Sequence, residues 1–590
     1  MRFDVVIENG LWFDGTGAPS ARRHLGLRDG TVVAVSEQPL DTAGARVIDA
    51  DGKWVLPGMV DIHTHYDVEV LRGPGLAESV RHGVTTILLG SCSLSTVHVG
   101  ATDAGDLFGR VEAIPRDYVI DAIGAHKSWS SAREYVDALE SLPLGPNLAA
   151  FIGHSDIRTA VMGLDRATRP DVRPTPSELA RMESMLSEAL NAGFVGMSAQ
   201  QLLFDKLDGE TCRSRTLPST YAKARERRRL NAVLRERARV LQAGPDITSP
   251  KSVGAMITST LGWGRKPLKT SLLSAADLKA NPALVHIMGP IARAMNALGG
   301  NFRWQHLPVP FEVYADGIDL VIFEEFGSGS AALHLRDQVE RNELLRDEEY
   351  RRRFRKDYDR KFTPHVWHRD FFDAEIVACP EPGVVGKTFG QVGRDRGVHP
   401  VDAYLDLVVE HGTKLRWRTT ISNHRPHHLD KLAADPGVQM GFSDAGAHLR
   451  NMSFYNFGLR LLRRAHAAEQ AGTPFLTLER AVHRLTGELA DWYGIDAGRL
   501  RVGDRADIVV VDPAHLDASL DEYAEEPVEQ YGGLRRMVNR NDDAVTAVFV
   551  AGRQLIADGE PTPDLGTTRS GQFLRAEASA PAARLDPVTA

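Results

Sequence analysis

Apolar runs alternate with helical segments over most of the chain, and this alternation constrains the fold more than any other feature. The runs and segments between residues 58 and 198 are Gly58–His63, Gly75–His82, Thr85–Leu89, Tyr135–Ser141, Leu148–Gly153, Ser177–Ala192 and Phe194–Ser198. Repeated βα units build a parallel sheet, and enough of them close into a barrel. The sequence therefore predicts an α/β fold, a (β/α)8 TIM-type barrel.

The two ends of the chain have a different texture, with short strand-like runs separated by tight turns. The first 56 residues contain the turn Asp29-Gly30 between apolar runs, which is a hairpin pattern. The pattern returns late, at Ala506–Val511 and Ala544–Val550. We expect a composite β-sandwich domain formed by residues 1–56 and 498–570, beside a barrel of residues 57–497.

Two densely charged stretches break the barrel rhythm. The first, near 205–245, contains the basic segment AKARERRRLNAVLRERARV, and the second, near 333–369, is longer than a usual barrel connection. We expect a charged helical insertion at each place, and the second suits a cap or a dimer arm, so the sequence is compatible with a homo-oligomer. The alanine-rich tail at 571–590 is expected to be disordered.

Composition narrows the class of function. The chain of 590 residues has a formal net charge of -8, which gives no reason to expect binding to nucleic acid. No apolar stretch approaches the roughly 18 residues that span a membrane, and Asp4 and Glu8 do not suit a signal peptide. The chain has only three cysteines, which favours a reducing compartment. We expect a cytoplasmic protein with a small-molecule substrate and no nucleic-acid or membrane partner.

A pair of histidines stands at the end of the first predicted barrel strand. In VLPGMVDIHTHYD, a Pro-Gly turn leads into an apolar strand that ends in His63-Thr64-His65. Residues i and i+2 of a strand point to the same side, so the two imidazoles converge. The carboxyl end of a barrel strand opens on the active-site mouth, and neutral imidazole binds zinc and similar ions. The pair therefore predicts a metal site.

This strand, placed after an N-terminal β unit, resembles the opening signature of the amidohydrolase superfamily. Further stretches resemble its N-acyl-D-amino-acid deacylase (D-aminoacylase) branch, and the last is similar to the return into the terminal β domain. They are SVRHGVTTILLGSCSLS at 79–95, NLAAFIGHSDIRTAVMG at 147–163 with NAGFVGMSA at 191–199, VQMGFSDAGAH at 438–448 and GRLRVGDRADIVVVDP at 498–513. The resemblance covers nearly the whole chain and implies a metal-dependent hydrolase.

Carried over position by position, the resemblance implies a site at the strand ends. His63 and His65 would bind one metal, and Cys92 matches the cysteine that ligates or bridges the metals, so one or two zinc ions are the expected cofactor. Asp444 matches the aspartate after the eighth strand, where a carboxylate touches the metal and accepts the proton of the attacking water. His448 would contact the substrate.

Two departures concern the fifth and sixth strands, where the family has metal-binding histidines. The fifth-strand region offers Gln242. After the sixth, Asp277 stands where the branch has histidine and is a candidate metal ligand, and Lys279 matches the lysine that holds a substrate carboxylate. Arg158, in the stretch GHSDIRTAVMG, is a second candidate for substrate binding.

The favoured function, implied by the resemblance, is hydrolysis of a non-peptide C–N bond in an N-acyl amino acid of D or L configuration, or in a related amide. Two alternatives stay open. A cyclic-amide hydrolase of the hydantoinase or dihydroorotase type would need a carbamylated lysine, for which Lys269 is the candidate. A barrel without metal chemistry, acting as a binding module, would account for the two missing histidines.

Overall fold

The centre of the molecule is a closed barrel. The computed structural model describes residues 2–360 and 365–577. In this part of the chain a parallel sheet runs in the order β17-β13-β12-β11-β10-β9-β8-β6, and the short strand β18 pairs with β7, which brings the last strand position back to the first. The strands are β6 (Met59–Asp61), β7 (His63–Thr64), β8 (Val84–Leu89), β9 (Asn147–Gly153), β10 (Gly196–Gln200), β11 (Val240–Gly244), β12 (Lys269–Leu272), β13 (Asn301–Gln305), β17 (Val438–Gln439) and β18 (Phe442–Ala445).

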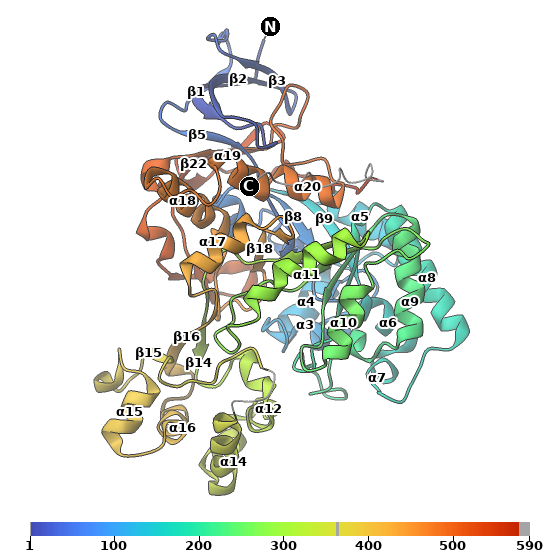
Figure 1. Cartoon of the computed structure of the whole chain (residues 1–590), viewed down its shortest axis with the longest axis vertical. Helices are drawn as coiled ribbons and strands as arrows, with labels where there is room; N and C mark the ends of the chain where they lie inside the picture. The colour runs from blue at the N-terminus through green and yellow to red at the C-terminus, as the bar shows by residue number, and fades with distance from the viewer. Residues whose placement is uncertain (1, 361–364, 578–590) are drawn as a thin grey trace.

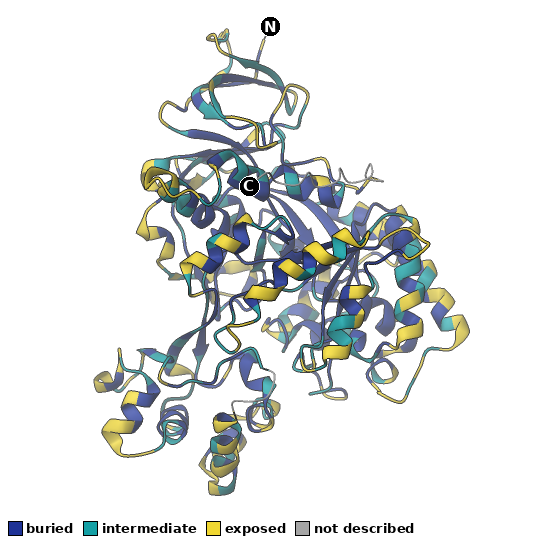
Figure 2. Ribbon diagram, in the orientation of Figure 1, coloured by how far each residue is buried: buried dark blue, intermediate teal, exposed yellow. Residues whose placement is uncertain are grey.

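Burial explains why these segments are strands. Every residue of β8 and of β9 is buried, as expected when helices cover one face of a parallel sheet and side chains fill the other. Figure 2 shows the barrel strands as a dark core behind helices that are yellow on their outer faces. The carboxyl ends of all the strands therefore open on one mouth.

The surrounding helices carry clear start signals. Helix α8 (Pro176–Asn191) begins at Thr175, whose side chain accepts from the backbone N–H of Glu178 while the Glu178 carboxylate accepts from that of Thr175. The other helices that line the outside of the barrel in Figure 1 include α2 (Ala77–Arg81), α5 (Ala132–Ser141), α6 (His154–Met162), α9 (Ala224–Glu236), α10 (Pro250–Thr258), α11 (Val285–Ala297), α17 (Pro426–Ala434) and α18 (Phe457–Gln470). Helix α9, from the first charged stretch, connects β10 to β11 as an ordinary barrel helix.

The two ends of the chain meet in one nine-stranded sheet. Its strands are β1 (Val5–Trp12), β2 (Ala21–Arg28), β3 (Thr31–Ser36), β4 (Arg46–Asp49), β5 (Trp54–Pro57), β19 (Ile508–Val511), β22 (Val545–Val550), β23 (Arg553–Ala557) and β24 (Glu560–Pro561). Antiparallel pairing of β5 with β19 joins the two halves. This sheet lies at the top of Figure 1, and the exact limits of the β domain stay a prediction.

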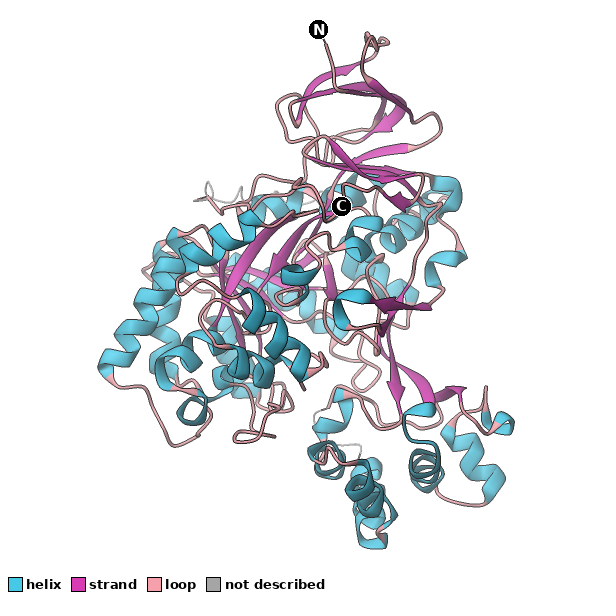
Figure 3. Ribbon diagram, turned by 180° about the vertical axis from the view of Figure 1, so that it is seen from behind, coloured by secondary structure: helices cyan, strands magenta, loops and turns pink. Residues whose placement is uncertain are grey.

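Residues 311–422 form a separate lobe between β13 and α17, which we call the inserted lobe. It is larger than the predicted insertion near 333–369 because an antiparallel sheet frames it. Its elements are β14 (Phe311–Asp316), α12 (Gly327–His334), α13 (Gln338–Arg346), α14 (Glu348–Asp359), β15 (Glu375–Ala378), α15 (Phe389–Arg396), α16 (Pro400–His411) and β16 (Arg416–Ser422). The lobe has its own aromatic core around Phe323, Trp367 and Trp417, and Figure 3 shows it projecting from the barrel.

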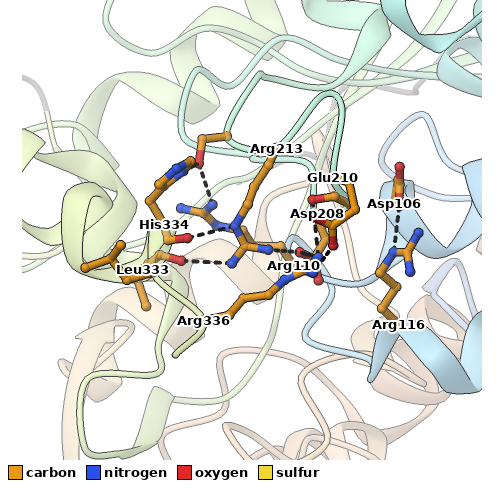
Figure 4. A network of polar contacts seen from close by, with 12 residues as sticks. Asp106, Arg110, Arg116, Asp208, Glu210, Arg213, Leu333, His334 and Arg336 are labelled. Carbon is orange, nitrogen blue, oxygen red and sulfur yellow. Dashed lines mark hydrogen bonds and ion pairs between the residues drawn. The ribbon is translucent and has the colours of Figure 1, made fainter. Parts of the chain in front are cut away.

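A polar network fastens the inserted lobe to the barrel side of the molecule. Arg110, just after helix α3 (Ala101–Phe108), donates from Nε to Glu324 Oε1 at 2.6 Å and from Nη1 to Ser214 Oγ at 2.7 Å. The Ser214 hydroxyl also bonds His334 Nδ1 at 2.7 Å, and Arg336 Nη2 donates to Asp208 Oδ1 at 2.7 Å. Figure 4 shows this network, which spans three segments far apart in the sequence.

The start of the predicted disordered tail lies on the barrel instead. Leu148 N–H donates to the Gln572 carbonyl, and Phe573 is 2% exposed and packs near Phe194, because these apolar side chains cover the edge of β9. The rest of the predicted tail, 578–590, lies outside the described residues. Among the described residues, no helix has both the length and the apolar character needed to cross a membrane.

Candidate metal centre

Four donor atoms from three strand ends converge at the barrel mouth. His63 Nε2 lies 3.3 Å from Cys92 Sγ and 3.4 Å from Asp444 Oδ1, and His65 Nε2 lies 3.1 Å from the same oxygen. The ligand atoms of His63, His65 and Cys92 all lie within 4.8 Å of one another. The two imidazoles therefore face one point, as the His-Thr-His spacing predicts, and the side chains of Cys92 and Asp444 face the same point.

The backbone at this mouth is held in unusual conformations. Cys92, Asp444 and His448 have φ values of 51°, 59° and 49°, in the left-handed region that non-glycine residues rarely occupy. Gly446 has a φ of 91°, and a Cβ at this position would lie 2.7 Å from the backbone carbon of His65. Such conformations cluster at functional sites, where the surrounding structure enforces them.

Gln305 sets the orientation of His63. Its Oε1 lies 2.8 Å from His63 Nδ1, and because a carbonyl oxygen only accepts, Nδ1 carries the hydrogen. The neutral ring then presents the lone pair of Nε2 to Cys92 and Asp444. Burial lowers the pKa of His63 to about 4, so the ring is neutral near pH 7 and suited to bind a metal.

Glu112 has the corresponding position beside His65. Its Oε1 lies 3.5 Å from His65 Nδ1, and its Oε2 lies 3.7 Å from His448 Nε2. A carboxylate at the far nitrogen of a ligating histidine fixes the ring and makes it a better ligand. Burial alone would lower the pKa of His65, but Glu112 and Asp444 raise it to about 9.

Buried acidic groups surround the four donors. Burial raises the pKa of Glu112 to about 8 and that of Asp205 to about 7, and it raises the pKa of the Cys92 thiol as well. Asp444 keeps its charge, since His65 and His63 lower its pKa to about 2 against the effect of burial. Such a group of acids is stabilised by a positive charge placed among them.

The donor set fits a zinc ion. Nitrogen and sulfur ligands about 2.0–2.3 Å from a tetrahedral zinc ion lie about 3.3–3.7 Å from one another. The contacts of His63 with Cys92 and with Asp444, at 3.3 and 3.4 Å, are close to that spacing. Imidazole and thiolate are ligands that zinc prefers.

Gln242 lies beside the centre without contributing a ligand. Its Oε1 accepts from the Cys92 backbone N–H at 3.3 Å, and its Nε2 donates to Ser91 Oγ at 3.3 Å. Both ends of the amide are therefore used in holding the Cys92 loop. A second metal site at the fifth strand would have to break these contacts.

The structure places the other predicted residues away from the four donors. Both carboxylate oxygens of buried Asp277 accept from Arg425, so Asp277 is not available as a metal ligand. Lys279 Nζ bonds both oxygens of Asp373 at 2.8 Å. These contacts argue against the predicted roles of Asp277 and Lys279, because each side chain already has an ionic partner.

Arg158 and Lys269 also have structural partners. Arg158, 1% exposed, is ion-paired with Glu226, so its predicted role in substrate binding is not supported. Lys269 begins β12 and donates to the Trp492 carbonyl at 2.9 Å. It does not line the cavity beside the metal centre, which removes the main support for the cyclic-amide alternative.

Sequence reasoning missed Glu112, Gln305 and Asp156. Glu112 follows Val111 and precedes Ala113-Ile114, and an acidic residue between apolar neighbours is the one sequence feature that could have marked it as a buried functional group. Asp156, in the stretch that drew attention to Arg158, accepts from Ser95 Oγ and from the backbone N–H groups of residues 97–99. It therefore orders the chain that follows Cys92.

Comparisons with known proteins agree with the barrel fold. The sequence model of the amidohydrolase family matches residues 46–257. An uncharacterised protein of Mycobacterium tuberculosis is 57% identical over 97% of this chain and 96% of its own length. The N-acyl-D-aspartate deacylase of Alcaligenes xylosoxydans is 26% identical over 97% of this chain and 95% of its own.

A solved structure extends the likeness to the fold. N-acyl-D-glutamate deacylase from Bordetella bronchiseptica, crystallised with zinc and a phosphonate inhibitor, superposes with a TM-score of 0.61, 23% identity and coverage of 98% of this chain and 100% of that one. The predicted α/β barrel fold is confirmed. The chain belongs to the amidohydrolase family, and it resembles the D-aminoacylase-like members of that family.

Proposed function

We propose that this enzyme is a zinc-dependent hydrolase of an amide C–N bond, with one ion held by His63, His65 and Cys92 and with Asp444 as the general base. The observation that supports it is the convergence of the four donor atoms, in which Asp444 Oδ1 lies 3.1 Å and 3.4 Å from the two imidazole nitrogens. A catalytic zinc site has three protein ligands and one open position. Asp444 stands beside that set.

Each residue has a distinct part in the reaction. Zinc, when bound, supplies Lewis acidity and lowers the pKa of water. Gln305 and Glu112 face the Nδ1 atoms of His63 and His65, so the Nε2 atoms of both rings point to the centre, and zinc would take the place of the Nε2 proton of His65. The ionised Asp444 accepts the proton of the attacking water and returns it to the leaving nitrogen, which departs as a neutral amine.

The contacts of Gln242 on the fifth strand and of Asp277 after the sixth strand support a site for one metal ion instead of two. Gln242 holds the Cys92 loop with both ends of its amide, and Asp277 is bound by Arg425. Neither residue is available to complete a second set of ligands. We therefore propose one zinc ion in place of two.

The bond cleaved is proposed to join an acyl group to nitrogen. The support is the likeness to the deacylases of Alcaligenes xylosoxydans and Bordetella bronchiseptica. His448, which lines the cavity beside Glu112, is proposed to contact this substrate. The configuration of the substrate, the oligomeric state and the cytoplasmic location stay predictions.

The test is a screen of N-acyl amides with the zinc-loaded protein and two variants. Asp444→Asn should retain zinc but lower kcat by about 100-fold or more, because it removes the proton acceptor. Lys279→Ala, the matched control for a residue placed outside the centre, should change kcat by less than about threefold. Activity that survives Asp444→Asn would contradict the proposed mechanism, and so would a screen in which no amide is hydrolysed.

A further inference from the structure

We propose that the substrate is an uncharged or cationic amide with a long apolar group, in place of an N-acyl amino acid with a free carboxylate. This inference rests on the proposed function, because it names the substrate class of the same site. It follows from the charges of the cavity beside the metal centre, from its walls, and from the positions of the predicted carboxylate-binding cations.

The metal centre opens into a cavity between the barrel and the inserted lobe. Its volume is about 420 Å³, within the range of pockets that enclose a small molecule. His63, Cys92 and Asp444 lie in its wall, and so do Leu320 and Ile421 of the lobe. A substrate that reaches the metal centre must therefore place the rest of its structure against these surfaces.

Acidic side chains line the cavity, and no lysine or arginine accompanies them among the described lining residues. The acidic residues are Glu112, Asp205, Glu325 and Asp444. A carboxylate taken from water into such a cavity needs a cationic partner, because its desolvation is otherwise uncompensated. Outside the metal centre, the carboxylate of an N-acyl amino acid would meet no lysine or arginine among the described lining residues, whereas a neutral amide needs no such partner and a cationic group would find an acid.

The cations predicted to hold a substrate carboxylate are engaged elsewhere. Lys279 bonds both oxygens of Asp373, which in turn lies 3.0 Å from His368 Nε2. Arg158 is buried against Glu226. Releasing either cation would strand its acidic partner, so neither can turn toward a substrate at low cost.

The walls of the cavity are apolar on the side of α10 and α11. Ile257 of α10 and Met288 and Ile291 of α11 line it, together with Leu273 after β12. Ile287, also in the lining, is 49% exposed and lies where the apolar wall reaches solvent. A continuous apolar surface therefore leads outward from the metal centre and matches an extended hydrocarbon group.

The expected gain from such a wall is large. Burial of one methylene group contributes about 0.8 kcal/mol, which corresponds to about a fourfold rise in kcat/KM for each methylene that becomes fully buried. Lengthening an acyl group from two to eight carbons should then raise kcat/KM by at least about 100-fold, even if burial is incomplete.

The first experiment compares four substrates that differ in chain length and charge. They are N-acetyl- and N-octanoyl-D-alanine and the corresponding D-alaninamides. We expect N-octanoyl-D-alaninamide to exceed N-octanoyl-D-alanine at least about tenfold and N-acetyl-D-alaninamide at least about 100-fold in kcat/KM. Equal or better hydrolysis of N-acetyl-D-alanine would overturn the inference and leave the proposed function standing.

Two pairs of variants test the walls directly. Ile291→Gln should lower kcat/KM for the octanoyl amide about tenfold, whereas Leu298→Gln, at an exposed position just after the same helix, should not change it. Ser274→Lys, in the cavity lining, should shift the preference toward the carboxylate substrate about tenfold. Ser177→Lys, at an exposed position on α8, is its control.

Equilibrium binding separates this inference from the proposed function. A fluorescent octyl amide should bind the metal-free protein at micromolar concentration, and octanamide but not octanoate should displace it. Octyl amide binding without hydrolysis of any substrate would overturn the proposed function alone. Failure to bind, or displacement by octanoate as effective as that by octanamide, would overturn the substrate inference.

Discussion

The two halves of the barrel mouth differ in what their strand ends carry. The half formed by β7, β8 and β18 presents His63, His65, Cys92 and Asp444, and their donor atoms converge. The half formed by β11, β12 and β13 carries the glutamines Gln242 and Gln305 and contributes apolar residues such as Leu273 to the cavity lining. We call them the metal half and the apolar half. The metal half carries the groups proposed to catalyse the reaction, and the apolar half is proposed to bind the substrate.

The apolar half carries Gln242 at the fifth strand, where the family resemblance implies a metal-binding histidine, and the glutamine is accommodated in the barrel. A glutamine amide offers one acceptor and two donors, so it can satisfy buried neighbours without binding zinc strongly. Gln242 uses its amide on the Cys92 loop, and Gln305 uses its carbonyl on His63. These glutamines support the metal half from across the mouth.

The largest expected effect comes from breaking the metal half. His65→Ala should lower kcat/KM at least about 1000-fold, because it removes a ligand and leaves Asp444 and Glu112 without the ring between them. Steady-state kinetics with an N-acyl amide measures it. His427→Ala, at an exposed position on α17, is the matched control. Comparable activity in both variants would place the chemistry elsewhere.

Glu226→Gln tests whether Arg158 stabilises the fold through its ion pair with Glu226 or takes part in the metal half or the apolar half of the barrel mouth. Burial alone would raise the pKa of Glu226, but His154 and Arg158 lower it to about 2, from an ordinary value of 4.5. The stabilisation is therefore present above about pH 4.5 and is lost as the pH falls toward 2. Glu226→Gln should cost about 3 kcal/mol at pH 7, measured by urea unfolding.

The same variant also separates a structural role of Arg158 from a role in substrate binding. The difference from the wild type should be constant between pH 8 and pH 5 and should shrink below about pH 4.5, as protonation removes the carboxylate from the wild type. KM at pH 7 should stay within about twofold of the wild-type value. A stable variant with a large rise in KM would return Arg158 to the substrate site.

A variant of Glu112 tests whether this residue positions the zinc ligand His65 within the metal half. Glu112→Gln should weaken zinc binding about 10- to 100-fold, because the glutamine that would then face His65 Nδ1 cannot ionise when zinc binds to the ring. A zinc titration with a competing chelator measures this, and excess zinc should restore most of the activity. Glu325→Gln is the control, since Glu325 also lines the cavity but accepts from the backbone of Val366 and Trp367. Equal zinc affinity in the two variants would remove the positioning role.

The smallest effect is expected at the contact that fastens the inserted lobe to the barrel side of the molecule. Arg110→Ala removes the hydrogen bonds that Arg110 donates to Glu324 and Ser214. KM for a long-chain amide should rise about three- to tenfold with kcat little changed, because the lobe wall is held less firmly. Arg352→Ala, on the exposed surface of α14, should leave both unchanged. A fall in kcat alone would argue against a role in binding.

The sequence predicted the metal half far better than the apolar half. His63 and His65 follow from strand periodicity, which is local, and Cys92 and Asp444 follow from the family resemblance. Glu112 contacts His65 across 47 positions of chain, and no local pattern marks such a contact. Asp277 and Lys279 are residue types that can bind a metal ion and a carboxylate. The sequence did not reveal that each has an ionic partner, because Arg425 and Asp373 are distant in the chain. The barrel was predictable from its alternation, whereas the extent of the inserted lobe was not, because β14 and β16 pair residues that lie 100 or more positions apart in the sequence.

The central claim is that one zinc ion occupies the metal half and none the apolar half. Elemental analysis of protein expressed with zinc, for the wild type and for Cys92→Ser, tests it most directly. The account predicts about one equivalent per chain in the wild type and much less than one in the variant after dialysis against a weak chelator. About two equivalents in the wild type, or less than about a tenth of one, would contradict it.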